Sequence, residues 1–134
     1  MNTYALDTNI ISYFLKDEEN VVNNMSQALM EGHKFIIPQV VDYETCRGFM
    51  LSDKSHLFGQ YRMFAQKTPI GKICDDVWVR AMHVYVELRK KGMPADDADI
   101  LIAAFCLVNG YILATENLKH FRHIEGLKAV NWKE

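Results

Sequence analysis

Cysteine is scarce in this sequence, and its scarcity excludes a fold built on disulfide bonds. The 134 residues include three cysteines, an odd number spread along the chain as Cys46, Cys74 and Cys106. Each lies in an apolar or helical context, so we interpret them as reduced thiols in a cytoplasm and as small buried hydrophobic residues.

Long hydrophobic runs and a strong excess of one charge are also missing. The longest strongly apolar stretch, Ile100–Val108, is about half the ~20 residues that a membrane-spanning helix needs. No charged segment followed by an apolar core opens the sequence, so we expect no secretory signal. The net charge of −2 neither predicts nor excludes binding to nucleic acid, because a local basic patch can hold phosphates. We therefore expect a cytoplasmic protein without a membrane segment.

An alternation of strand and helix patterns runs along the chain. With 49% apolar residues and no repeat or linker, we expect a single domain over residues 1–134. Short apolar runs predict strands at 3–7, 34–38, 70–73, 111–115 and 127–130. Helical spacing and caps predict helices over 8–15, 21–31, 40–50, 53–67, 75–91 and 97–109. Such alternation predicts a parallel sheet with helices on both faces.

Three carboxylates are expected to meet at one edge of this sheet. Asp7 ends the first strand, and Glu44 lies early in the helix after the second. Asp99 opens the helix that precedes the strand ending at Thr115. In open α/β sheets, functional sites form in the crevice beyond the carboxyl ends of the strands. The sequence therefore predicts an acidic site at that edge.

Such a cluster predicts binding of a divalent cation. Carboxylates that are packed together raise each other's pKa unless a cation or a proton intervenes. A set without cysteine or histidine is an all-oxygen site, which suits Mg²⁺ or Mn²⁺ rather than zinc. Because magnesium held in this way commonly serves phosphate-ester chemistry, we interpret Asp7, Glu44 and Asp99 as catalytic and metal-binding residues.

Each acid taken alone has a simpler structural explanation. Asp7 can cap the helix that starts at Thr8, and the helix dipole alone explains Asp96 at a helix start. Asp99 is harder to explain, because it precedes the apolar run Ile100–Ala104, where an uncompensated carboxylate is costly. The joint placement of the three acids, rather than any one of them, carries the interpretation.

Taken in order, these motifs resemble the PIN domain family, and within it the VapC-type toxins of bacterial toxin–antitoxin pairs. The matching segments lie between residues 4 and 132, and their ordered combination is more specific than any one fragment. They are Leu6-Asp7-Thr8-Asn9, Tyr43-Glu44 with Arg47-Gly48, Gly92-x-Pro94, Asp97-x-Asp99-Ile-Leu-Ile-Ala-Ala104, Leu113-Ala-Thr115-x-Asn117-x-x-His120-Phe121, Gly126-Leu127 and Asn131-Trp132.

The resemblance implies a three-layer α/β/α sandwich with a central parallel sheet and an endoribonuclease activity that depends on Mg²⁺ or Mn²⁺. In the family, the acids that match Asp7, Glu44 and Asp99 hold the ion, which activates water for hydrolysis of RNA phosphodiester bonds. The resemblance also implies an RNA substrate such as a tRNA, a homodimer, and a small cognate antitoxin whose C-terminal segment covers the acidic groove. For the homodimer interface we expect the apolar helices within residues 21–66.

Five further residues are expected to support the carboxylates. In the family a fourth acid often stands two residues after the threonine that matches Thr115, and here Asn117 occupies that position. An amide adds no negative charge, so we expect a single ion rather than a tight two-metal site. We expect Asn9 and Thr115 to orient carboxylates and water. We expect Asp97 to supply outer negative charge, and Arg47 to contact a substrate phosphate or a carboxylate.

A second interpretation stays open, in which the fold is a catalytically weakened module that binds RNA or protein. Asn117 would be an early sign of that loss, whereas the retention of all three carboxylates argues against it. Lys119, His120, Arg122 and His123 follow the last site strand and can hold RNA phosphates in either case. The spacing of the two histidines also permits a zinc site, although no third ligand is suggested nearby.

Overall fold

Short apolar segments form one parallel sheet in the computed structural model, which describes residues 1–134. Its strand order is β3-β2-β1-β4-β5, and every neighbouring pair is parallel. The sheet therefore confirms the predicted parallel arrangement, with β1 at its centre. The strands are β1 Thr3–Leu6, β2 Lys34–Pro38, β3 Ile70–Gly71, β4 Ile112–Ala114 and β5 Ala129–Val130.

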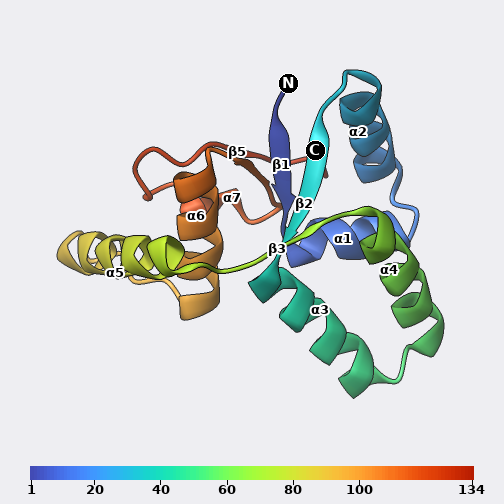
Figure 1. Cartoon of the computed structure of the whole chain (residues 1–134), viewed down its shortest axis with the longest axis horizontal. Helices are drawn as coiled ribbons and strands as arrows, with labels where there is room; N and C mark the ends of the chain where they lie inside the picture. Colours follow the sequence, from blue (N-terminus) through green and yellow to red (C-terminus); the bar gives the residue numbers. More distant parts are fainter.

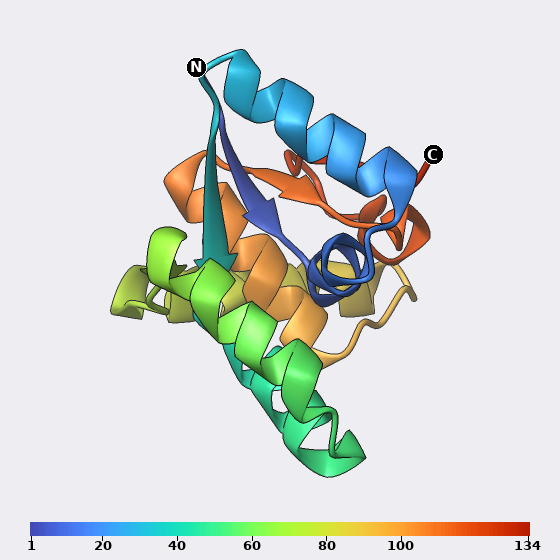
Figure 2. The ribbon, with the colours of Figure 1, turned by 90° about the vertical axis from the view of Figure 1, so that its right-hand side faces the viewer.

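Helices cover both faces of the sheet, as Figure 1 shows. Helices α5 and α6 lie on one side, whereas α1, α2 and α4 lie on the other. Helix α3 continues beyond the edge toward which the arrowheads of β1 and β2 point (Figure 2). The predicted three-layer α/β/α sandwich is thus confirmed. The helices are α1 Thr8–Leu15, α2 Glu19–Met30, α3 Gln39–Ser52, α4 Ser55–Lys67, α5 Asp75–Lys90, α6 Asp97–Asn109 and α7 Leu118–Phe121.

The sequence prediction and the structure differ at the short elements. Helix α7 was not predicted, because a four-residue helix is too short to show an apolar period. The strand expected at 127–130 is formed only by its last two residues. Strand β3 likewise covers only the first two residues of the expected 70–73 segment. Edge strands of this length leave little periodic signal in the sequence.

The core lies where α6 crosses the central strands. Ala5, Leu6, Leu113 and Ala114 in β1 and β4 are completely buried. Helix α6 is buried around most of its circumference between Ile100 and Cys106, which explains why its sequence is apolar without an amphipathic pattern. No helix here combines the length and the apolar character needed to cross a membrane.

The cysteines are free, as predicted, but they do not share one environment. Cys106 is buried in α6 and Cys46 is partly buried, in agreement with a role as small core residues. Cys74 is exposed, which corrects the expectation for that residue. It precedes the first turn of α5 at the N-cap position, where the chain leaves the sheet edge.

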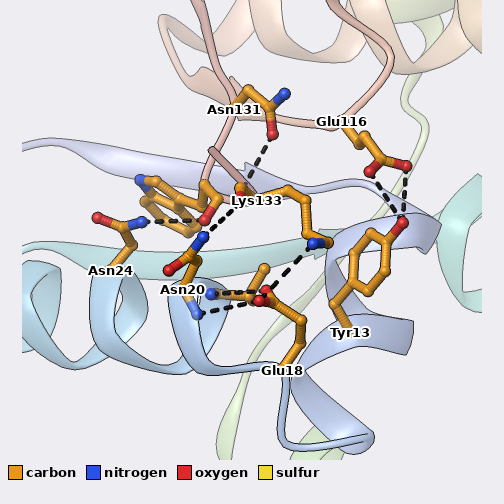
Figure 3. Close-up of polar contacts among 9 residues, drawn as sticks. Tyr13, Glu18, Asn20, Asn24, Glu116, Asn131 and Lys133 are labelled. Carbon is orange, nitrogen blue, oxygen red and sulfur yellow. Dashed lines mark hydrogen bonds and ion pairs between the residues drawn. The ribbon is translucent and has the colours of Figure 1, made fainter.

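The C-terminal residues are tied to the first turns of α2 by a polar network (Figure 3). Asn20 and Asn24 of α2 donate to the backbone carbonyls of Lys133 and Trp132, at 2.8 Å and 2.9 Å. Lys133 Nζ lies 3.7 Å from the carboxylate of Glu18, which caps α2. These contacts hold α2 against the end of the chain, so the C-terminal residues help to close the layer that contains α1 and α2.

Glycine at position 71 is required by the close approach of β3 to α6. A Cβ there would overlap the Phe105 ring and come within 3.0 Å of Ile36 Cδ1. We expect Gly71→Ala to lower the free energy of unfolding by about 1–3 kcal/mol through overpacking. Gly59→Ala in α4 is the control, because a Cβ there meets nothing within 4 Å and alanine favours a helix by up to about 1 kcal/mol. Urea unfolding of both variants checks this, and an equal effect of the two would contradict it.

Candidate active site

The structure brings Asp7, Glu44 and Asp99 to the carboxyl edge of the sheet. Asp7 lies between β1 and α1, Glu44 in α3 after β2, and Asp99 in the first turn of α6. The charges of Asp7 and Glu44 both raise the pKa of Asp99, which shows that the three groups share one electrostatic environment. The predicted convergence of these acids is therefore present in the fold.

Asp7 is the most firmly held of the three carboxylates. Its Oδ1 accepts a hydrogen bond from the backbone N–H of Thr8 at 2.8 Å, which caps α1. Its Oδ2 accepts from the Thr115 hydroxyl at 2.7 Å and from the Asn9 amide at 3.4 Å. Only 6% of the residue is exposed. Asp7 is thus a helix cap and a site carboxylate at once, and it keeps one fixed orientation.

Asn9 and Thr115 extend this arrangement into the loop after β4. The Asn9 side-chain oxygen accepts from the backbone N–H of Glu116 at 2.9 Å, and the Thr115 hydroxyl accepts from the backbone N–H of Asn117 at 3.0 Å. The Tyr13 hydroxyl lies 2.8 Å from both carboxylate oxygens of Glu116 (Figure 3). The loop is therefore fixed against α1, with Asn117 held through its backbone.

Glu44 is less buried and has weaker partners. Its Oε1 accepts from the Thr8 hydroxyl at 3.2 Å. Its Oε2 lies 3.9 Å from the Arg47 guanidinium, whose side chain is 60% exposed. The same guanidinium packs over the Tyr43 ring at 4.8 Å. Arg47 thus stands at the rim of the site, where it reaches Glu44 and remains open to a ligand.

Asp99 lies beside Asp96 rather than beside Asp97. The Asp96 side chain accepts from the backbone N–H of Asp99 at 2.9 Å and caps α6. Its charge raises the pKa of both Asp99 and Glu44. Asp97 is exposed, and no contact in the structure joins it to the three carboxylates. Asp96, which the helix dipole alone explained in the sequence, thus adds negative charge beside Asp99 and Glu44. The outer charge expected from Asp97 stays a prediction.

Burial raises the pKa of all three carboxyl groups, and neighbouring negative charges raise it further at Glu44 and Asp99. Desolvation is the largest cause for Asp7, and the hydrogen bonds from Thr115 and Thr8 oppose it. Desolvation also raises the pKa of Glu44. The pKa of Asp99 rises to about 6, first through desolvation and then through the charges of Asp96 and Asp7, while His120 opposes the shift. His120 Nδ1 lies 3.5 Å from the Asp99 carboxylate.

Two clefts flank the carboxylates. The first, here called the α3 cleft, has a volume of about 160 Å³ and shares Glu44 and Thr8 with the site. The second, here called the α6 cleft, has a volume of about 420 Å³ and shares Asp96 and Asp99. Basic side chains line both, with Lys16 and Lys54 in the α3 cleft and Lys119, His120 and His123 in the α6 cleft. The acids therefore lie between two partly basic hollows.

Comparison with known proteins assigns the fold to a family. The family model described as PIN domain matches residues 4–127. The chain belongs to the PIN domain family. It is 26% identical over 130 residues to ribonuclease VapC2 of Rickettsia felis, covering 96% of this chain and 97% of the relative. It is 35% identical to ribonuclease VapC1 of Methanocaldococcus jannaschii over 68 residues, about half of each protein.

A solved structure supports the same fold. The chain superimposes with a TM-score of 0.89 on a chain of the crystal structure of VapBC2 from Rickettsia felis bound to a DNA fragment from their promoter. The two are 26% identical, and the match covers 97% of this PIN domain and 98% of that chain. The likeness extends over the α3–α4 pair as well as the sheet, because nearly the whole of each chain is aligned.

The donor set of this PIN domain fits a hard divalent cation. All the candidate ligands are carboxylate oxygens, which suit Mg²⁺ or Mn²⁺. No three side chains among histidine, cysteine, aspartate and glutamate converge closely enough to enclose an ion. Magnesium does not require such a cage, because it keeps several waters and uses one or two carboxylates directly.

The desolvation of Asp99 and the repulsion around it together make a prediction about stability. Because its pKa in the folded state, about 6, lies above the ordinary 3.8, Asp99 lowers the free energy of unfolding progressively as pH rises from about 4 to about 6. Asp99→Asn should therefore stabilise the metal-free protein at neutral pH by about 1 kcal/mol, after allowance for solvent screening. The gain should shrink as the pH falls below about 6. Unfolding in the presence of a chelator measures it.

Asp97→Asn is the matched control for this prediction. It removes one negative charge from the same helical turn. Asp97, however, is exposed, and its charge interacts favourably with the helix dipole at the N-terminus of α6. Its replacement should lower the free energy of unfolding by a few tenths of a kcal/mol. A loss of stability in Asp99→Asn as well would contradict the desolvation and repulsion described above.

Proposed function

We propose that this protein is a VapC-type ribonuclease toxin, an endoribonuclease that hydrolyses RNA phosphodiester bonds with the help of Mg²⁺ or Mn²⁺. The observation that carries the proposal is the convergence of Asp7, Glu44 and Asp99, with raised pKa values, between two clefts with basic linings. Carboxylates held in such repulsion are arranged to receive a cation. The names of the full-length relatives support the choice of RNA as the substrate.

The three carboxylates have different roles in the proposed site, according to how firmly hydrogen bonds hold each of them. Asp7, Glu44 and Asp99 would hold a divalent ion together, one or two of them directly and the others through its waters. The ion would neutralise charge at the phosphate and lower the pKa of water. Asp7 gives a rigid anchor, because Thr115 and Asn9 donate to the same oxygen. Glu44 and Asp99, which are more exposed, face the two clefts.

Arg47 and Asn117 complete the proposed site. The exposed guanidinium of Arg47, 3.9 Å from Glu44, is placed to contact a substrate phosphate in a charge-assisted hydrogen bond. Asn117 adds no charge to the three carboxylates, which supports a single ion rather than two. The alternative of a weakened module that binds RNA or protein rests on this one residue, and the cleavage experiment below separates the two functions.

We also propose a cognate antitoxin as partner, a homodimer as the assembly, and the cytoplasm as the location. The similar structure from Rickettsia felis is a VapBC2 complex, which supports the antitoxin. Exposed apolar side chains support association between copies. Met50 and Leu51, at the end of α3, are 66% and 90% exposed and lie in the expected 21–66 region. A further exposed row lies on α5, outside that region: Trp78, Val79, Met82, Tyr85 and Val86.

The purified protein should cleave RNA only when a divalent cation is present. Asp7→Asn should lower the rate on the order of 100-fold or more, since loss of outer partners of a metal site alone costs about 10–100-fold. Glu31→Gln is the charge-matched control, because Glu31 lies at the end of α2, just before the amino end of β2. Gel analysis of total tRNA with and without Mg²⁺ checks this. Equal cleavage by wild type and Asp7→Asn would rule out the proposed site.

Production of the protein without its antitoxin should arrest bacterial growth. The reason is that an endoribonuclease with an uncovered groove would cut cellular RNA. Growth curves after induction measure the effect, with Asp7→Asn as the control at a matched level of soluble protein. Normal growth with abundant soluble wild type would contradict the toxin function but not the ribonuclease activity itself.

A further inference from the structure

Helix α5 has two apolar faces, and the fold covers only one of them. The helix lies at the outer side of the molecule and packs against α6 (Figure 1). Its covered face consists of the buried residues Val77, Ala81, Val84 and Leu88. The other apolar face, here called the α5 row, is exposed and consists of Trp78, Val79, Met82, Tyr85 and Val86. A surface helix normally carries polar side chains away from its buried face, so the α5 row needs a separate explanation.

The α5 row is a continuous stripe rather than a set of scattered residues. Met82 is its centre, with members three and four positions away on both sides. At about 100° per residue, all of them fall within about 60° of Met82 around the helix. Each is between 43% and 63% exposed. Contiguous apolar surface of this kind marks an interaction site, and tryptophan, tyrosine and methionine are enriched in protein interfaces. The row therefore indicates a protein partner.

Two charges of opposite sign lie at the ends of the row. Asp75 in the first turn of α5 and Arg89 in its last turn are each seven positions from Met82, which is about two turns and so returns to the side of the row. The Arg89 guanidinium lies over the Tyr85 ring, 5.3 Å from its centroid. Neither Asp75 nor Arg89 forms an ion pair within the chain. Both charges are therefore available to a partner.

The row and its terminal charges match a second copy of the same helix. When two α5 helices run antiparallel with Met82 opposite Met82, Trp78 of each copy faces Val86 of the other. In the same alignment Asp75 of each copy faces Arg89 of the other, which gives two pairs of opposite charge. A parallel alignment would place Asp75 against Asp75 and Arg89 against Arg89, where like charges repel. Antiparallel helices also bring opposite dipole ends together. The charges therefore select the antiparallel arrangement.

We propose that the α5 row is a homodimer interface, in which two copies of this chain pair through antiparallel α5 helices around a two-fold axis at Met82. Every contact then occurs twice, as an isologous interface requires. The inference rests on the proposed homodimer and places its interface on α5 instead of within residues 21–66. An apolar face alone also suits an antitoxin segment, whereas the order of charges along α5 is complementary to α5 itself.

The size of the row predicts a weak dimer. A helix of 16 residues is about 24 Å long and ~10 Å wide, so this contact buries less than the ~800 Å² per partner of a standard stable interface. We expect a dissociation constant on the order of 1–100 μM, as for interfaces at the small end of the range. The fraction of dimer should therefore depend on protein concentration, which sedimentation velocity measures.

Met82→Glu tests the centre of the interface. Two glutamates would face each other at the two-fold axis, so we expect self-association to weaken on the order of 100-fold or more. The matched control is Met50→Glu, which changes a methionine of nearly equal exposure, 66% against 63%, at the end of α3 in the 21–66 region. It should leave the dimer intact. Because both side chains are exposed, circular dichroism should show the helix content of the wild type in both variants.

Reversal of the terminal charges tests the antiparallel alignment. Asp75→Lys and Arg89→Glu should each weaken self-association by about 3- to 10-fold, since two attractive pairs become repulsive. An equimolar mixture of the two variants should associate as tightly as the wild type, because both pairs in the mixed dimer are attractive. Asp76→Lys and Lys90→Glu are the matched controls, since they reverse charges in the same two turns but outside the row. Neither control should weaken self-association.

The outcomes separate this interface from the rest of the proposed function. Dissociation by Met82→Glu, with rescue in the mixed charge variants, supports the interface whether or not the protein cleaves RNA. A wild type that stays monomeric above the expected concentration range overturns both the interface and the homodimer, and it leaves the ribonuclease proposal to its own test. A dimer that Met50→Glu dissociates and Met82→Glu does not overturns the interface alone. So does a Met82→Glu protein that remains dimeric but no longer binds its antitoxin, since the row would then belong to the antitoxin.

Discussion

The burial of the Asp7 carboxylate at the β1–α1 junction is the constraint on which the site depends. A buried carboxylate is tolerated only when hydrogen bonds replace the lost water. Here they come from three places: the first N–H of α1, the Asn9 amide, and the Thr115 hydroxyl, which lies 108 positions later in the sequence. The same bonds that satisfy Asp7 therefore tie the loop after β4 to the start of α1. Once that loop is fixed, the carboxyl edge of the sheet has one defined shape.

The other two carboxylates are held loosely by comparison, and this difference has a physical reason. Glu44 and Asp99 stand on different helices, α3 and α6, and their partners are weak: Thr8 and Arg47 for Glu44, and His120 for Asp99. Their charges repel Asp7 and each other, so the metal-free site opposes the folding that forms it. Repulsion of this kind is typical of sites that bind a ligand. The stability lost at the site is offset by packing elsewhere in the protein. Here the buried apolar residues of α6 and the central strands supply that packing.

Much of the fold and the acidic site could be predicted from the sequence. The strand ending at Asp7 and the apolar run after Asp99 are local patterns, and parallel strands bring their carboxyl ends to one edge. The roles of Asp96 and Asp97 could not be predicted, because both are suitable for the first turn of a helix. Only the cap geometry decides that Asp96 turns toward Asp99. The exposure of the α5 row was also missed, since nothing in a sequence shows which apolar face of a helix is covered.

The sequence by itself determined the alternation of the five strands with the six longer helices, the apolar core, and the three acids expected at one edge of the sheet. These follow from periodicity and caps, which act over a few residues and so can be read along one chain. Tertiary structure alone decided that Lys16, Glu44 and Lys54 line one cleft, and that Asp7 and Thr115 share a hydrogen bond. These contacts depend on how α1, α3 and α4 pack around the edge of the sheet. Packing combines many weak contacts among distant residues, and no local pattern encodes it.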